Sequence, residues 1–125
     1  MKPKLLIIDD EVHIGEALTY ALEDRYQVMT ATNSQQALRR LEQQPTDLVL
    51  LDLRLGSEDG LEVLNQIKHH YPLIEIIIIT AFGSIQSSVE AIKRGAFYYI
   101  TKPLDLNELD IYLSKAHQKR EALLA

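Results

Sequence analysis

Short apolar runs recur along this chain, and four of them lead directly into polar residues that can do chemistry. Runs of four aliphatic or aromatic residues of this kind predict strands that are buried on both faces. If the strands are parallel, their C-terminal ends share one edge of a sheet, where open α/β sheets bind ligands. We therefore expect three carboxylates, a hydroxyl and an amine to meet in one cleft. The runs are 5–8, followed by Asp9-Asp10; 48–51, followed by Asp52; 76–79, followed by Thr80; and 97–100, followed by Thr101-Lys102-Pro103.

Segments with helical spacing of apolar residues alternate with these runs. A further strand is expected at 26–31, and helices are expected around 12–22, 37–41, 61–67, 85–92 and 106–116. Asn33-Ser34, Asp59 and Asp105 are placed to cap helix N-termini, and Gly95 is placed at a helix C-terminus. Residues 56–60 carry a loop signal. The pattern predicts five β/α pairs in one α/β domain, and 125 residues is the length of one domain.

Composition narrows the class of protein. The chain has no cysteine, which excludes disulfides and thiolate metal sites, and it has 13 basic and 18 acidic residues, a net charge of −5. An acidic domain lacks the basic surface that is typical of nucleic-acid-binding proteins. No apolar stretch is long enough to span a membrane, and Met1-Lys2-Pro3 does not begin a signal peptide. We expect a cytoplasmic protein that contacts neither membrane nor nucleic acid through this domain.

The polar residues at the strand ends suit one kind of chemistry. Two adjacent acids, Asp9 and Asp10, with Asp52 at a neighbouring strand end, offer the oxygen ligands that Mg²⁺ prefers. A carboxylate can act as nucleophile toward phosphorus, and Asp52 stands alone between apolar neighbours. Lys102 adds a cation for phosphoryl oxygens. Each of these acids taken singly is more often a helix cap or a solvated turn, so the inference depends on the combination.

The set Asp9-Asp10, Asp52, Thr80-Ala81 and Lys102-Pro103, in this order and on this frame, resembles the receiver domain of two-component response regulators. The resemblance covers essentially the whole chain. It implies a flavodoxin-like (βα)5 fold with a doubly wound parallel sheet in the strand order 2-1-3-4-5. It also implies phosphorylation of Asp52 by a phosphohistidine on a sensor histidine kinase or a phosphotransfer protein, with Mg²⁺ as cofactor.

The resemblance assigns roles residue by residue. Asp10 and Asp52 resemble direct Mg²⁺ ligands, joined by the backbone carbonyl of Arg54, and Asp9 resembles an acid that often acts through water. The remaining positions of the motif resemble the groups that contact the phosphoryl oxygens and switch with them. These are Thr80, Ala81 and Lys102, with Tyr99 as the switch aromatic and Lys102-Pro103 as a cis peptide.

A finer resemblance points to the nitrogen-regulator (NtrC) type of receiver. It is carried by residues 80–84, 91–97 and 102–105. Receivers of this type precede an ATPase domain and a DNA-binding domain in transcription activators. The last expected helix, about 105–125, ends without a glycine or proline stop. Two interpretations of this helix therefore stay open. It leads into an absent output domain, or it is a C-terminus that frays.

Several positions depart from the common receiver pattern. Gly56 stands where a proline is frequent and Glu58 where an apolar residue is frequent. We expect these two residues to loosen the loop after Asp52 or to alter its surface. Arg54 and Phe82 each lie two residues after a motif position, and their bulk predicts shielding of an acyl phosphate from attacking water.

The leading interpretation is a signalling switch, not an enzyme with a separate substrate. Phosphorylation of Asp52 would reshape the face formed by the fourth helix, fifth strand and fifth helix, and so control transcription or dimerisation. A stand-alone receiver that regulates a partner by direct binding is the alternative.

Other functions fit the residues less well. In a small aspartate-dependent phosphatase, the position of Arg54 typically holds an acid. A nucleotide or flavin module would need a glycine-rich loop after the first strand, where Asp9, Asp10 and Glu11 stand. A receiver-like domain that cannot be phosphorylated would not need the intact acidic set.

Overall fold

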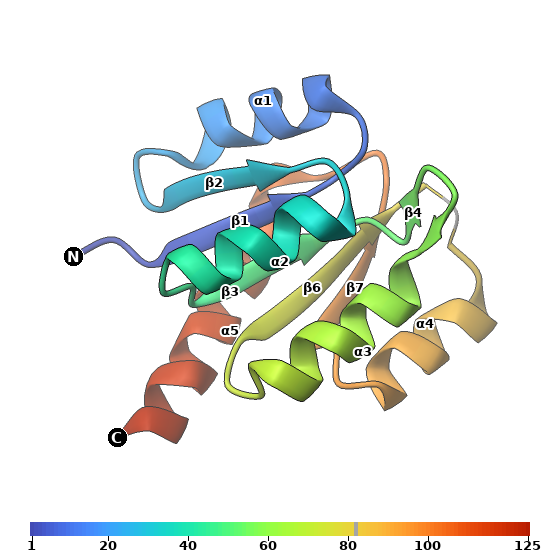
Figure 1. Ribbon diagram of the computed structural model, residues 1–125. Helices are drawn as coiled ribbons and strands as arrows, with labels where there is room; N and C mark the ends of the chain where they lie inside the picture. Colours follow the sequence, from blue (N-terminus) through green and yellow to red (C-terminus); the bar gives the residue numbers. More distant parts are fainter. Residues whose placement is uncertain (82) are drawn as a thin grey trace.

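Five parallel strands form the central sheet of the protein in the computed structural model, which describes residues 1–81 and 83–125. Their order is β2-β1-β3-β6-β7, which confirms the expected flavodoxin-like order 2-1-3-4-5 (Figure 1). The strands pair in register from one edge of the sheet to the other, so their C-terminal ends lie side by side. They are β1 (Lys4–Ile8), β2 (Gln27–Ala31), β3 (Leu48–Leu51), β6 (Glu75–Thr80) and β7 (Tyr98–Thr101).

Helices cover both faces of this sheet. Because successive strand residues point to opposite faces, each buried strand supplies two hydrophobic clusters. One cluster packs against α2, α3 and α4, and the other packs against α1 and α5 (Figure 1). Within the described residues, no helix combines the length and the apolar character needed to cross a membrane. The helices are α1 (Val12–Leu22), α2 (Ser34–Gln43), α3 (Gly60–His70), α4 (Ile85–Lys93) and α5 (Leu106–Leu124).

The helix ends follow the capping pattern of the sequence. The side chains of Asn33, Asp59 and Asp105 accept backbone N–H groups in the first turns of α2, α3 and α5. Ser84 forms a capping box at the start of α4. Gly95 follows α4 with a φ of 105°, a conformation that glycine adopts without strain. These N-caps fix where α2, α3, α4 and α5 begin, whereas Glu11 at the start of α1 forms no side-chain cap hydrogen bond.

A small antiparallel hairpin follows β3, in the region that the sequence predicts to be a loop. It consists of β4 (Arg54–Leu55) and β5 (Glu58–Asp59), and Leu55 is buried in the hydrophobic core. Gly56 turns the chain with a φ of 62°. Gly60 lies so close to the backbone of Leu53 that a Cβ atom would sit 2.4 Å from its Cα. Burial and backbone contacts hold the chain here, and the expected effect of Gly56 and Glu58 on the looseness or the surface of this segment stays a prediction.

The outer side of α4 is apolar and exposed. Ile85, Val89 and Ile92 have exposed fractions of 86%, 47% and 48%. Beside α4, the edge strand β7 carries Tyr98, whose ring stacks on Tyr112 of α5 with centroids 3.6 Å apart. The surface formed by α4, β7 and α5 therefore carries exposed apolar side chains beside a stacked tyrosine pair, and Ala91 is the residue of α4 that is buried.

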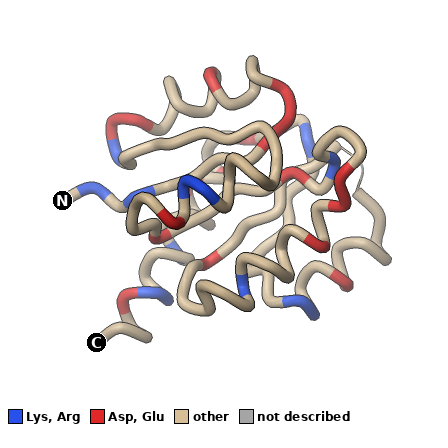
Figure 2. Tube along the Cα trace, viewed as in Figure 1, with Lys and Arg blue, Asp and Glu red and all other residues tan. Residues whose placement is uncertain are grey.

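Ion pairs gather at the other edge of the sheet, where the strands begin. Glu75, the first residue of β6, is buried, and its Oε2 lies 3.1 Å from Lys119 Nζ. Arg120 Nε lies 3.0 Å from Asp47 Oδ1 and also donates from Nη1 to the carbonyl of Leu73. Lys119 and Arg120 belong to α5, so these contacts hold its C-terminal half against the start of the sheet. Figure 2 shows basic and acidic positions on this part of the chain, near the C-terminus.

Candidate functional site

The polar residues that follow the strands meet at the C-terminal edge of the sheet. Asp9 and Asp10 follow β1, and Asp52 follows β3 with its backbone N–H bonded to the carbonyl of Ile8. Thr80 ends β6, and the backbone N–H of Lys102 donates to its carbonyl. Strand pairing therefore brings these side chains together.

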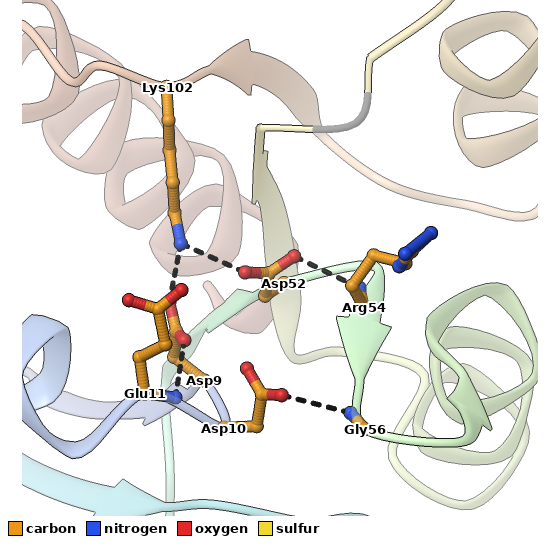
Figure 3. Close-up of polar contacts among 7 residues, drawn as sticks. All are labelled: Asp9, Asp10, Glu11, Asp52, Arg54, Gly56 and Lys102. Carbon is orange, nitrogen blue, oxygen red and sulfur yellow. Dashed lines mark hydrogen bonds and ion pairs between the residues drawn. The ribbon is translucent and has the colours of Figure 1, made fainter.

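Lys102 bridges two buried acids across the site. Its Nζ lies 2.8 Å from Asp9 Oδ2 and 2.9 Å from Asp52 Oδ2 (Figure 3). The side chain of Asp9 is 0% exposed, that of Asp52 is 6% exposed and that of Lys102 is 14% exposed. Since these contacts are charge-assisted and shielded from water, they are stronger than surface ion pairs.

Burial and hydrogen bonding act in opposite directions on these groups. Burial raises the pKa of Asp9, and this effect outweighs the hydrogen bonds from Lys102 and from the backbone N–H of Glu11 that lower it. Burial alone would lower the pKa of Lys102, but its hydrogen bonds to Asp9 and Asp52 outweigh burial and raise it. One ammonium therefore compensates the acids only in part, and the site keeps an excess of negative charge.

The donor set fits a hard divalent cation. Asp9, Asp10 and Asp52 each offer a carboxylate oxygen, and these three oxygens lie within 4.8 Å of one another. Asp10 is exposed to solvent and is oriented by the backbone N–H of Gly56, which lies 3.0 Å from its Oδ2. All-oxygen sites with several carboxylates are the kind that Mg²⁺ occupies. The residues present are therefore suited to hold this ion.

The other predicted site residues lie around the same acids. A cavity of about 290 Å³ is lined by Asp10, Asp52, Arg54, Ala81 and Lys102, among others. The backbone N–H of Arg54 donates to Asp52 Oδ1 over 3.0 Å, whereas its side chain extends away from the acids (Figure 3). Its predicted effect on hydrolysis stays a prediction. Phe82, which shares that prediction, lies outside the described residues.

The predicted switch residues lie next to the acids and toward α4. Thr80 is fully buried at the end of β6. The hydroxyl of Tyr99 on β7 lies 3.0 Å from Ser87 Oγ on α4, so in this structure the ring is tied to that helix. The peptide bond between Lys102 and Pro103 is cis. Tyr99 thus links the sheet edge that carries the site to the apolar surface of α4.

The backbone hydrogen bonds that orient the acids were not predicted from the sequence, and two of them hold Asp9 and Asp10. The backbone N–H of Glu11 donates to Asp9 Oδ1 over 2.9 Å, and the N–H of Gly56 donates to Asp10. The first is a local turn that an Asp two residues earlier can signal. The second joins positions 46 residues apart, so a pattern in the sequence of one segment does not reveal it.

Comparison with known proteins agrees with this geometry. Residues 5–114 match the response regulator receiver domain family. The transcriptional regulatory protein ZraR of Klebsiella oxytoca is 40% identical over 113 residues, which are 90% of this chain and 26% of that protein. A putative NtrX-like response regulator of Rickettsia typhi is 45% identical over 115 residues, 90% of this chain and 24% of that protein. The chain thus spans about a quarter of these relatives.

Solved structures show the same likeness. A CheY-like receiver domain protein from Methanospirillum hungatei JF-1 superposes with a TM-score of 0.92 at 27% identity, covering 98% of both chains. NtrX from Brucella abortus superposes with a TM-score of 0.89 at 31% identity, covering 98% of this chain and 28% of that one. The relatives are regulators of the NtrC-like type, as the sequence resemblance implied. The chain belongs to the response regulator receiver domain family.

Proposed function

We propose that this domain is a phosphorelay switch in which Asp52 accepts a phosphoryl group from a phosphohistidine of a sensor kinase or a phosphotransfer protein. One observation carries the proposal. The Asp52 carboxylate is fixed from two sides, by Lys102 at Oδ2 and by the backbone N–H of Arg54 at Oδ1, beside two further acids. A nucleophile held in one orientation next to a cation site is suited to in-line attack on phosphorus.

The transfer needs few groups from the protein. A carboxylate oxygen of Asp52 forms a bond to phosphorus while the bond from phosphorus to the imidazole nitrogen of the donor breaks. The bonding electron pair leaves with that imidazole, which takes up a proton. Lys102, 2.9 Å from Asp52 Oδ2, is placed to remain beside the transferred oxygens as their counter-charge. Asp9, Asp10, Asp52 and the carbonyl of Arg54 would hold Mg²⁺, which supplies further neutralisation of phosphoryl charge when bound.

The readout of phosphorylation is proposed to run from Thr80 to the α4 surface. The new phosphoryl oxygens would attract the hydroxyl of Thr80, and Tyr99 would leave Ser87 and pack inward. The hydrogen bond from Tyr99 to Ser87 and the exposed apolar residues of α4 support this route. We propose that the surface of α4, β7 and α5 then controls dimerisation and a transcription output, since ZraR and its like are named transcriptional regulators. Direct regulation of a partner by a stand-alone receiver is the alternative.

A mass measurement tests the proposal. The protein is incubated with Mg²⁺ and a small acyl phosphate, and its intact mass is recorded. Wild type and Asp24→Asn, which removes an exposed acid far from the site, should each gain one phosphoryl group. Asp52→Asn should gain none. The absence of any gain in wild type, or an equal gain in Asp52→Asn, would reject Asp52 as the acceptor.

A further inference from the structure

The hairpin after β3 supplies backbone groups that orient two of the three acids. The N–H of Arg54, in β4, donates to Asp52 Oδ1, and the N–H of Gly56, in the turn, donates to Asp10 Oδ2 (Figure 3). Both distances are 3.0 Å. The orientation of these carboxylates therefore depends on where the hairpin lies, as metal ligands in general depend on the groups that hydrogen-bond to them.

Glu58 ties the other strand of this hairpin to a different element. Its Oε1 accepts the backbone N–H of Ser34 over 2.9 Å, and its Oε2 accepts the hydroxyl of the same residue. Ser34 is the first residue of α2, where exposed N–H groups and the helix dipole favour a carboxylate. Two contacts to one residue fix both the distance and the rotation of the Glu58 carboxylate.

The register of the hairpin carries this restraint to the acids. Glu58 pairs with Leu55, and Leu55 lies between Arg54 and Gly56, whose N–H groups reach Asp52 and Asp10. Leu55 is 3% exposed, so the hairpin is fixed in the core on one side and on α2 through Glu58 on another. A shift in the position of Glu58 would therefore move both N–H groups.

We propose that Glu58 is a positioning residue for the acidic site. Held by Ser34, it keeps the hairpin where the N–H groups of Gly56 and Arg54 orient Asp10 and Asp52 toward a bound Mg²⁺. This inference rests on the proposed function, because that function supplies the ion. It also couples Ser34 to the metal site, so a ligand that binds Ser34 in place of Glu58 would alter Mg²⁺ affinity.

The test compares Mg²⁺ affinity with thermal stability in the 125-residue protein. Glu58→Ala loses both contacts to Ser34 and should weaken Mg²⁺ binding, measured by calorimetric titration, by up to about tenfold. Glu58→Gln can still accept the N–H of Ser34 and should keep most of the affinity. Asn33→Ala is the matched control, because it removes the cap of α2 and leaves Glu58 and Ser34 in place. It should lower the melting temperature without weakening Mg²⁺ binding.

Amide NMR spectra provide a second readout. The Gly56 and Arg54 N–H signals should move in Glu58→Ala and stay in place in Asn33→Ala. Unchanged Mg²⁺ affinity in Glu58→Ala, or an equal loss of affinity in Asn33→Ala, would overturn the inference and leave the proposed function standing. If wild type binds no Mg²⁺, or if Asp10→Asn binds it equally well, the Mg²⁺ site of the proposed function fails, and the inference fails with it.

Discussion

Lys102 is the residue on which two buried carboxylates depend for their counter-charge. Lys102→Met keeps much of the side-chain volume but leaves Asp9 and Asp52 without the ammonium that lies within 2.9 Å of both. We expect the free energy of unfolding in urea at neutral pH to fall by about 2–3 kcal/mol, somewhat less than for a fully buried pair. Lys93→Met, at an exposed position in α4, should change it little. Equal stabilities for the two variants would contradict this role of Lys102.

Tyr98 is expected to titrate later than an ordinary tyrosine. Its hydrogen bond with Tyr112, with smaller effects of burial and of Glu108, raises its pKa to about 12. Because the folded state retains the proton, Tyr98 contributes stability below the unfolded pKa of about 10, and this contribution is lost between about pH 10 and pH 12. Burial also raises the pKa of Tyr26. Absorbance titration should therefore show two late tyrosines in wild type and in Tyr20→Phe, but only that of Tyr26 in Tyr112→Phe. Two late steps that survive Tyr112→Phe would exclude this cause.

The individual site residues differ in how far the sequence reveals them. Asp9 and Asp52 directly follow apolar runs, and Lys102 follows another after one residue. The periodicity that predicts the strands therefore also predicts that their ends converge. Glu58 is different, because its partner Ser34 lies 24 residues away on another element. From the sequence, Glu58 is expected only to loosen the loop or to alter its surface, whereas in the structure its carboxylate binds Ser34. Contacts between elements of this kind follow from packing, which no local pattern encodes.

At the scale of elements, ion pairs hold the C-terminal half of α5 against the sheet. Arg120→Ala removes the contacts to Asp47 and to the carbonyl of Leu73. Amide hydrogen exchange in residues 117–124 should become faster, by the equivalent of about 1 kcal/mol of local stability, while β1 and β3 keep their protection. Gln118→Ala, on the exposed side of the same turn, should leave exchange nearly unchanged. Equal protection in both variants would show that Arg120 does not hold the helix.

The elements themselves were predictable to different degrees. The five strands and five helices appear where apolar periodicity places them, because buried parallel strands and amphipathic helices repeat their signal over several residues. The hairpin 54–59 overlaps residues 56–60, which were predicted as a loop, since two-residue strands are too short to show a period. In α4 the helix was predicted, but Ile85, Val89 and Ile92 face outward. Periodicity identifies an apolar face of a helix, but it does not show whether that face packs against the core of the same chain.

Across the whole molecule, the two edges of the sheet differ in how completely their charges are paired. At the edge where the strands begin, Glu75 and Asp47 each contact a cation of α5, and Lys68 Nζ also lies 3.9 Å from Glu75. At the C-terminal edge, Lys102 pairs with Asp9 and Asp52, and Asp10 belongs to the same cluster of three carboxylates. Repulsion among these acids disfavours the folded state. A cation bound at the C-terminal edge would therefore stabilise the folded state.

Mg²⁺ should therefore raise the stability of the whole domain. A cation that binds only the folded state adds about 1.4 kcal/mol when its concentration is ten times the dissociation constant. Thermal melts with increasing MgCl₂ should show a rise in melting temperature for wild type and a much smaller one for Asp10→Asn, which loses a charged ligand at the exposed side of the cluster. NaCl at matched ionic strength separates binding from screening, since screening acts on every surface charge. If NaCl reproduces the rise, or Asp10→Asn shows all of it, the acids do not form a specific Mg²⁺ site.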